Sequence, residues 1–341
     1  MSTDIAIDIG TYKTVLCSGE KIVLELPSVV TVDADTREPL YFGNKAFSTI
    51  GRTPDSLECV FPIRRSVIAD YDIAEYMLRE YMTSAFGNRI IKPKVMVVMP
   101  GGVTEMQHHS VADVVEASGG RNASTIEAPL AAAVGLGIDF TLPRGSMVVD
   151  FGAGTTDVAS LSMGGIAACD SIPVASRDLD ESIIKYVKRR HNILIGLTTA
   201  EKIKKSIGSA VERNLEVAVT MKGRHLHTGL PTSFEITSGE VYSAISGNCY
   251  SIIAGIRKVM EKTPPDLVAD IMTDGIYLTG GGSLLNGFNK LLEKSIGTKV
   301  IMAEDPLHSA VYGAAKALKN PRFLENVDYQ YRAIRELEVE E

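Results

Sequence analysis

The sequence predicts an α/β protein of two similar lobes, in which mostly parallel sheets are covered by helices. Two observations predict this fold. Strand-like apolar runs alternate with segments of helical spacing, an order typical of sheets covered by helices. One strand motif also occurs twice, as Ile5–Thr11 and Met147–Asp157, and each copy ends in Asp-x-Gly, at Asp8 and Asp150. The copies are about one domain length apart, so we expect two lobes built alike.

The segments between and after the two copies follow the same alternation. Between the copies, apolar spacing predicts a helix, a buried strand and a second helix, at 72–85, 94–99 and 103–117. After the second copy it predicts helices at 179–191 and 199–207, the latter opened by a threonine cap, and an extended segment at 215–220.

The last third of the chain begins with a long predicted helix at 239–260, which Pro264 and Pro265 should end. A strand at 276–279 then runs into Gly280, Gly281 and Gly282, and a helix is expected at 283–294. The glutamate-rich end of the chain is predicted to be a solvated or frayed helix.

The composition excludes several classes of protein. The 341 residues are 45% hydrophobic and 23% charged, which excludes a disordered or low-complexity chain. Lys and Arg number 35 against 42 Asp and Glu, and without a basic block a nucleic-acid partner is not expected. The four cysteines form no Cys-x-x-Cys pair, and no secretory or membrane-spanning segment is recognised, so we expect a cytoplasmic protein.

The two Asp-x-Gly turns are candidates for phosphate binding. Glycine permits a tight turn whose backbone N–H groups can contact an anion, and the glycines and hydroxyls concerned are Gly10, Thr11, Gly152, Gly154 and Thr155. Asp8 and Asp150 would face a hydrated Mg²⁺, which keeps most of its waters. One such turn alone is more often a plain hairpin. Two copies together with the triplet Gly280–Gly282, which can lie against a flat adenine, favour a nucleotide.

These motifs resemble those of the MreB family of bacterial actin homologues, within the superfamily of actin, heat-shock chaperones and sugar kinases. The resemblance covers nearly the whole chain. It rests on the two phosphate loops and the adenosine motif, Ile7–Thr11, Asp150–Thr156 and Leu278–Leu285. Matches outside the site separate this family from its superfamily relatives, and they are Val67–Tyr71, Thr228–Pro231 and Glu261–Pro265.

The resemblance implies an actin-like fold of duplicated ribonuclease-H-like lobes with inserted small subdomains. The first lobe would span 1–140 with an insert at about 30–68, and the second 141–318 with an insert at about 179–240. Residues 319–341 would form a C-terminal helix or tail.

The resemblance also implies ATP and Mg²⁺ in the central cleft, with Asp8 and Asp150 as the catalytic and metal-binding acids. Glu201 and Lys204 match the family helix that reaches the ribose and base, although the residues alone suggest a solvated helix face. The chain is expected to polymerise into a shape-determining filament at the inner face of the cell membrane, with cell-wall synthesis or morphogenesis proteins as partners.

One departure from the family pattern concerns hydrolysis. Where the family has Glu-Glu-Pro, this chain has Glu127-Ala128-Pro129, and the second Glu is the one expected to position the attacking water. Its loss predicts a slow or absent ATPase that still binds Mg·ATP. If both residues lie on a helix, Glu127 points about 100° away and cannot substitute. The alternative is that Glu127 or another acid rescues the step and the chain is an active ATPase or phosphotransferase.

Two further departures place cations near the expected ligand. The family's Thr-Ala-Asn-Thr is Thr11-Tyr12-Lys13-Thr14 here, so Lys13 either touches a phosphate or points to solvent. The family's Ala-Gly-Asp-Glu is Ala175-Ser176-Arg177-Asp178, which brings Arg177 close to where the sugar should lie.

A candidate membrane contact precedes the predicted strand at 94–99. Ile90 and Ile91 lie between Arg89 and Lys92, a pattern that can dip into a bilayer interface while the cations meet anionic headgroups. The corresponding loop of MreB relatives is a hydrophobic membrane contact. The alternative is that Ile90 begins the next strand and packs inward.

Overall fold

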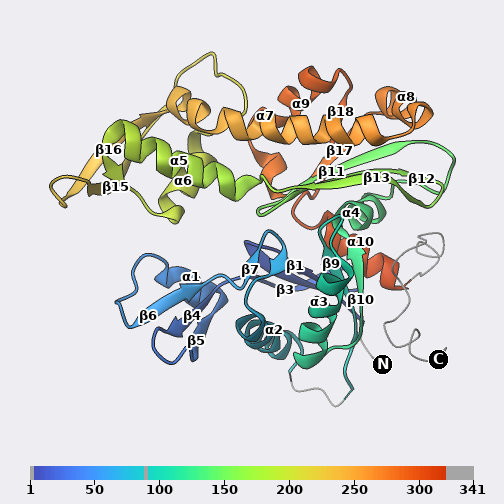
Figure 1. Cartoon of the computed structure of the whole chain (residues 1–341), viewed down its shortest axis with the longest axis horizontal. Helices are drawn as coiled ribbons and strands as arrows, with labels where there is room; N and C mark the ends of the chain where they lie inside the picture. The colour runs from blue at the N-terminus through green and yellow to red at the C-terminus, as the bar shows by residue number, and fades with distance from the viewer. Residues whose placement is uncertain (1–3, 88–90, 320–341) are drawn as a thin grey trace.

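In the computed structural model, which describes residues 4–87 and 91–319, each of two lobes is built on a five-stranded sheet (Figure 1). The first sheet has the order β10-β9-β1-β2-β3, with bounds Arg121–Glu127, Lys94–Met99, Ile5–Ile9, Lys13–Ser18 and Lys21–Pro27. The second has the order β13-β12-β11-β17-β18, with bounds Gly165–Ile172, Thr156–Ser162, Ser146–Phe151, Ile276–Thr279 and Val300–Met302. The strand that carries each Asp-x-Gly motif, β1 or β11, is central in its sheet, which confirms the duplicated two-lobed fold.

The prediction of mostly parallel sheets is wrong, because both sheets are mixed. β1 pairs parallel with β9 but antiparallel with β2, and β11 pairs parallel with β17 but antiparallel with β12. The physical reason is the Asp-x-Gly turn itself. Only three residues separate β1 from β2 and four separate β11 from β12, which is enough for a hairpin and too short for the crossover that a parallel pair needs.

Helices cover these sheets, and two of them pack where the lobes meet. In the first lobe they are α2 (Tyr71–Phe86) and α3 (Glu105–Ala117). In the second they are α5 (Ser176–His191), α6 (Leu197–Ile207), α7 (Ser238–Lys262), α8 (Pro265–Asp274) and α9 (Phe288–Ile296). α4 (Ala128–Leu136) and α10 (Ser309–Lys319) pack on each other where the lobes meet, in one apolar core with residues of both sheets.

Two small sheets extend the lobes on the same side of the molecule (Figure 1). The first has the order β5-β4-β6, with bounds Pro39–Phe42, Val30–Asp33 and Leu57–Val60, and α1 (Gly43–Thr49) packs on it. The second has the order β14-β15-β16, with bounds Ile193–Leu194, Ala218–His225 and Pro231–Thr237. A two-stranded ribbon, β7 (Ile63–Arg64) and β8 (Val67–Ile68), follows the first of them.

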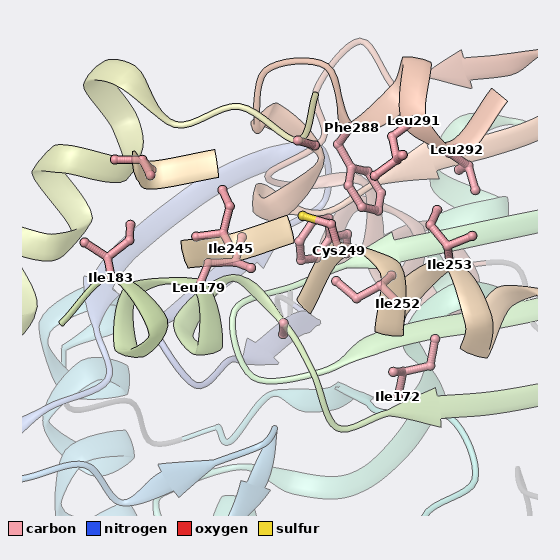
Figure 2. Packing of buried hydrophobic residues seen from close by; sticks show 14 of the residues in the cluster. Ile172, Leu179, Ile183, Ile245, Cys249, Ile252, Ile253, Phe288, Leu291 and Leu292 are labelled. Atoms are coloured by element: carbon pink, nitrogen blue, oxygen red, sulfur yellow. The ribbon is translucent and has the colours of Figure 1, made fainter. Parts of the chain in front are cut away.

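Among the described residues, the largest apolar core lies in the second lobe, around α7 (Figure 2). Ile245, Cys249, Ile252 and Ile256 recur at helical spacing along α7 and are fully buried, so one face of this long helix packs inward. Ring packing continues the core, since the centroids of Phe151 and Phe288 are 4.7 Å apart. This core fixes the end of β11 and therefore the second Asp-x-Gly turn.

The sequence-based helices at 72–85, 103–117, 179–191 and 239–260 and the strand at 94–99 are confirmed within a few residues. The threonine cap predicted for the helix at 199–207 is wrong, because α6 begins earlier and Gly196 precedes it without a side-chain cap. The single helix predicted at 283–294 is also wrong. A 3₁₀ turn, Gly281–Leu284, is separated from α9 by Gly287, whose φ of 73° breaks a helix.

In the described part of the chain, no helix combines the length and the apolar character needed to cross a membrane.

Candidate functional site

A cavity of about 830 Å³ lies between the two lobes and is large enough to hold most of a nucleotide-sized ligand. Both Asp-x-Gly turns contribute to its wall, and so does the glycine triplet. The predicted residues that line it are Asp8, Gly10, Thr11, Lys13, Ala128, Asp150, Gly152, Thr155, Glu201, Lys204, Gly280, Gly281 and Gly282. The structure thus brings together residues from both halves of the chain at one cleft.

The two turns touch each other. Each is closed by a backbone hydrogen bond, from Gly10 N to Lys13 O at 3.1 Å and from Gly152 N to Thr155 O at 3.0 Å. A Cβ added at Gly154 would lie 2.1 Å from Thr11 Oγ1, so glycine is required there by the approach of the other lobe. The hydroxyls and backbone of both turns therefore converge from opposite sides.

Three carboxylates gather behind these turns. Burial raises the pKa of Asp8 to about 6, with the charge of Asp157 adding to it and Lys13 and His308 opposing. Burial, and then the charges of Asp157 and Asp8, raise the pKa of Asp150 well above its usual value. A cation placed among these acids would relieve their repulsion.

Asp157 is a site residue that the sequence analysis did not single out. Its Oδ1 accepts from Gly101 N at 3.0 Å and its Oδ2 accepts from Thr155 Oγ1 at 2.8 Å, and it lines the cavity. The signal was present in the hairpin, because Asp157 is the cross-strand partner of Asp150 in the β11–β12 register. Residues that face each other in this way lie on the same side of a sheet.

The glycine triplet packs against the second turn. A Cβ at Gly280 would lie 2.3 Å from Asp150 Oδ1, and one at Gly282 would lie 2.4 Å from the Phe151 ring. Gly280 N also donates to Pro306 O at 2.9 Å. These glycines serve close packing, and at the same time they form part of the cavity wall.

The alternative suggested by the residues alone, that α6 presents an ordinary solvated face here, does not hold for Lys204. Its ammonium donates to Ser176 O, Ser176 Oγ and Asp180 Oδ2 at 2.8, 2.7 and 2.8 Å, and these three acceptors use all three of its N–H groups. Lys204 therefore fixes α6 against the start of α5. Glu201 has partners of its own, Lys205 at 2.7 Å and Tyr12 at 3.2 Å.

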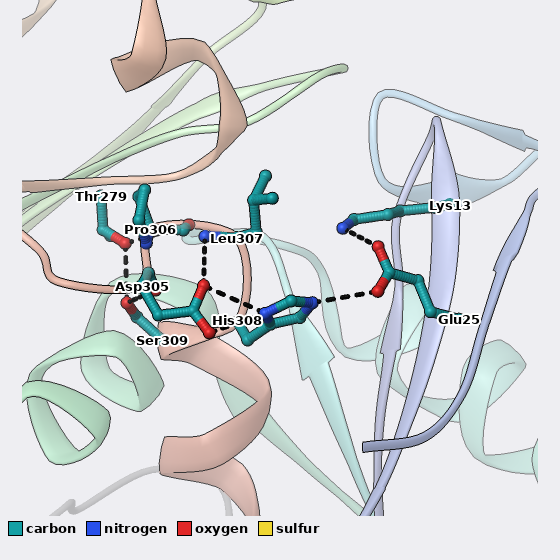
Figure 3. Close-up of polar contacts among 8 residues, drawn as sticks. All are labelled: Lys13, Glu25, Thr279, Asp305, Pro306, Leu307, His308 and Ser309. Atoms are coloured by element: carbon teal, nitrogen blue, oxygen red, sulfur yellow. Dashed lines mark hydrogen bonds and ion pairs between the residues drawn. The ribbon is translucent and has the colours of Figure 1, made fainter.

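Lys13 stands at the beginning of a polar chain along the cavity (Figure 3). It forms an ion pair with Glu25, whose second oxygen lies 3.2 Å from Nε2 of His308, and Nδ1 of His308 lies 2.8 Å from Asp305. Burial opposes the charge on Glu25, but the hydrogen bonds from Lys13 and His308 hold its pKa below the usual value. Asp305 belongs to the segment that returns from β18 to α10. This series of polar contacts therefore connects the hairpin of β1 and β2 to the segment that leads into α10.

Glu127 and Ala128 do not both lie within one helix, so the argument from helical rotation is corrected. Glu127 ends β10 and Ala128 begins α4. Ala128 lines the cavity, whereas Glu127 is buried, accepts from Gly102 N at 3.4 Å, and has a second oxygen without a partner among the described residues. Burial, and then the charge of Asp157, raise its pKa. The change from strand to helix between Glu127 and Ala128 thus gives the two side chains different surroundings: Ala128 faces the cavity and Glu127 is held near Gly102.

The remaining predicted residues lie as follows. Arg177 lines the cavity, but its guanidinium lies 4.4 Å from the centre of the Phe61 ring, on the other lobe. Ile91 is 62% exposed. Arg89 and Ile90 lie outside the described residues.

Two lobes of the same sheet topology, whose acidic hairpin turns meet at one central cleft, define the actin-like class of proteins. Within that class, the chain belongs to the MreB/Mbl family, since the family model described as MreB/Mbl protein matches residues 2–326. The relatives Mbl of Bacillus cereus and MreB of Escherichia coli, compared below, are named as cell shape-determining proteins. The family resemblance seen in the sequence is therefore confirmed.

Individual relatives agree over nearly the whole chain. The cell shape-determining protein Mbl of Bacillus cereus is 38% identical over 319 residues, covering 93% of this chain and 96% of the relative. MreB of Escherichia coli is 36% identical over 325 residues, covering 93% of this chain and 94% of the relative.

Solved structures show the same fold. MreB5 of Spiroplasma citri bound to ADP superposes with a TM-score of 0.89 at 31% identity, covering 96% of this chain and 99% of that one. The same protein bound to AMPPNP also gives 0.89, covering 94% and 97%. The MamK double helical filament gives 0.79 at 19% identity, covering 93% and 99%, which is a likeness of fold.

Proposed function

We propose that this chain is a nucleotide-dependent cytoskeletal filament protein, which binds Mg·ATP between its lobes and polymerises at the inner membrane surface to determine cell shape. The observation that carries the proposal is the contact between the two Asp-x-Gly turns, with Gly154 of one lobe against Thr11 of the other. A ligand held by both turns meets backbone N–H donors, which bind an anion, and carboxylates, which bind a cation. It must therefore be an anion with a bound metal ion.

The residues divide into three groups by the part of the nucleotide that they would hold. The backbone and hydroxyls of Gly10, Thr11, Gly152, Gly154 and Thr155 would bind phosphates, and Lys13 would leave Glu25 to do the same. Gly280–Gly282, Glu201 and Lys204 would contact the adenosine. Asp8 and Asp150 would hold Mg²⁺ through its waters, because this ion dehydrates reluctantly and takes only one or two carboxylates. The ion would neutralise phosphate charge.

Hydrolysis in this proposal is weak. The family's water-positioning glutamate is Ala128 here, and Ala128 lines the cavity, while Glu127 turns away towards Gly102. A methyl group cannot orient a water for in-line attack. The second candidate function, an active ATPase or phosphotransferase, is favoured by Asp157, a third carboxylate at the cavity.

Polymerisation completes the proposal. Head-to-tail contacts between identical subunits give filaments when the operation does not close, and the relatives MreB and Mbl are shape-determining proteins. We assign the lobes to 1–140 and 141–318, with small inserted subdomains at about 30–68 and 179–240. Nucleotide between them would set their relative angle, which a subunit contact can sense. Cell-wall synthesis or morphogenesis proteins would be the further partners.

The nucleotide site is tested by melting the purified protein with ATP and Mg²⁺. We expect a saturable rise in melting temperature that is lost on chelating Mg²⁺, because a ligand that binds only the folded state stabilises it. Asp150→Asn should weaken binding about tenfold, as expected when a hydrogen bond to a charged group is lost. Asp266→Asn, on α8, is the matched control. If ATP produces no saturable change in the wild type, the chain is a nucleotide-free structural protein instead.

Membrane contact is supported by the exposed Ile91 side chain. We expect Ile91→Ser to reduce co-sedimentation with anionic liposomes about fivefold, because an aliphatic side chain inserted at the interface contributes through its buried area. Leu142→Ser removes another exposed aliphatic, in the loop before β11, and should leave sedimentation unchanged. Equal binding by wild type and Ile91→Ser would remove this part of the proposal.

A further inference from the structure

The rim of the cleft contains a hydrogen bond that joins the two lobes. Tyr12, in the turn between β1 and β2, donates its hydroxyl to Glu201 Oε2 on α6 at 3.2 Å. The other oxygen of Glu201 is held by Lys205, at 2.7 Å. Each oxygen of this carboxylate thus has one donor, and one of the two donors comes from the opposite lobe.

Tyr12 is itself held in place. Its ring meets the ring of Phe47, on α1, edge-on with centroids 6.0 Å apart, and the Lys205 ammonium lies 5.9 Å from the Tyr12 ring centre. Burial, and then the charge of Glu201, raise the pKa of Tyr12. The phenol therefore stays protonated at neutral pH and can donate its hydrogen bond to Glu201.

A second contact lies along the same rim. The guanidinium carbon of Arg177 lies 4.4 Å from the centre of the Phe61 ring, in the first lobe. The backbone N–H of Arg177 donates to Ala153 O at 3.0 Å. Tyr12, Phe47, Phe61, Arg177 and Glu201 all line the cavity. Tyr12 and Arg177 are each one of the positions at which the sequence departs from the family's Thr-Ala-Asn-Thr and Ala-Gly-Asp-Glu, and both form contacts between the lobes.

We propose that Tyr12 is a positioning residue for the nucleoside end of the cleft: from the first lobe it orients the Glu201 carboxylate that would accept hydrogen bonds from the ribose hydroxyls. The inference rests on the proposed function, which places adenosine beside Glu201. A carboxylate has about four acceptor sites, so Glu201 keeps acceptors for a diol after Tyr12 and Lys205 are bound. Recognition of the sugar is then linked to contact between the lobes, and Arg177 strengthens that contact without touching Glu201.

The test uses Tyr12→Phe, which keeps the ring against Phe47 and removes only the hydroxyl. We expect a fluorescent ATP analogue to dissociate about fivefold faster, since a partly exposed hydrogen bond to a charged group is lost. The preference for ATP over 2′-deoxy-ATP should also fall, which a purely structural role would not change. Glu201→Gln should lower the same preference, and the double variant should lose little more than either single variant.

Two controls separate the possible causes. Arg177→Leu should speed dissociation but leave the ratio of ATP to 2′-deoxy-ATP affinity unchanged. Tyr76→Phe removes the hydroxyl of a 47% exposed tyrosine on α2 and should change neither quantity. If the wild type binds ATP and Tyr12→Phe shows wild-type dissociation and preference, this inference is overturned and the proposed function stands. If the wild type binds no nucleotide, both are overturned.

Discussion

Replacing Ala128 with glutamate should raise the rate of phosphate release from ATP about a hundredfold, the usual range for a positioned acid or base. Ala128 is the first residue of α4 and lines the cavity, so a longer side chain there would reach into it. A carboxylate at a helix N-terminus is also favoured by the helix dipole. The measurement is single-turnover phosphate release by the purified protein with saturating Mg·ATP.

Glu127→Gln is the companion variant, because Glu127 is the neighbouring carboxyl that could take over the same task. It is buried against Gly102, and we expect its amide to leave wild-type turnover unchanged. Wild-type turnover as fast as that of Ala128→Glu would refute a weakened ATPase. If Glu127→Gln then abolished it, Glu127 would be the rescuing acid.

Replacing Gly313 with alanine should destabilise the fold by about 3 kcal/mol or more, the cost typical of severe overpacking between two backbones. A Cβ at Gly313 would lie 1.7 Å from the carbonyl oxygen of Ala131, and one at Gly135 would lie 2.0 Å from that of Ser309. α4 and α10 therefore cross with glycine on each side and cannot move apart without disturbing the core they share with both sheets. Urea unfolding followed by circular dichroism measures the effect.

Gly247→Ala is the matched control for this substitution. Gly247 is also inside a helix, α7, but a Cβ there meets nothing within 4 Å. It should stabilise the protein by about 1 kcal/mol through helix propensity. Equal unfolding midpoints for Gly313→Ala and the wild type would show that α4 and α10 do not touch in solution.

Much of the fold was predictable because its signals are local. The helix at 239–260 was recognised from apolar residues at helical spacing, and the structure places that face in the main core. The single helix expected at 283–294 failed at Gly287, whose φ of 73° interrupts it. Gly287 also packs against Val211, where a Cβ would lie 2.5 Å from Val211 Cγ2. This tertiary contact leaves no room for a side chain at the position where the helix is interrupted.

The candidate site divides in the same way. Asp8, Asp150 and the glycine triplet were found from the sequence because a strand followed by Asp-x-Gly carries its own turn chemistry. Asp157 was missed because its importance depends on the hairpin register. Lys204 lines the cavity as expected of a residue near the ribose and base, and its ammonium also donates to Ser176 and Asp180, contacts that no spacing along the chain reveals.

By itself, the sequence determined that this protein has two lobes built on the same acidic turn, since each turn is encoded within about ten residues. The tertiary structure alone decided how the lobes meet: Gly154 against Thr11, Tyr12 against Glu201, and Arg177 against Phe61. Tyr12 and Glu201 are 189 residues apart. Contacts over such separations arise only when both cores have formed and α4 and α10 hold them at a fixed distance, so their geometry is set by packing rather than by local pattern.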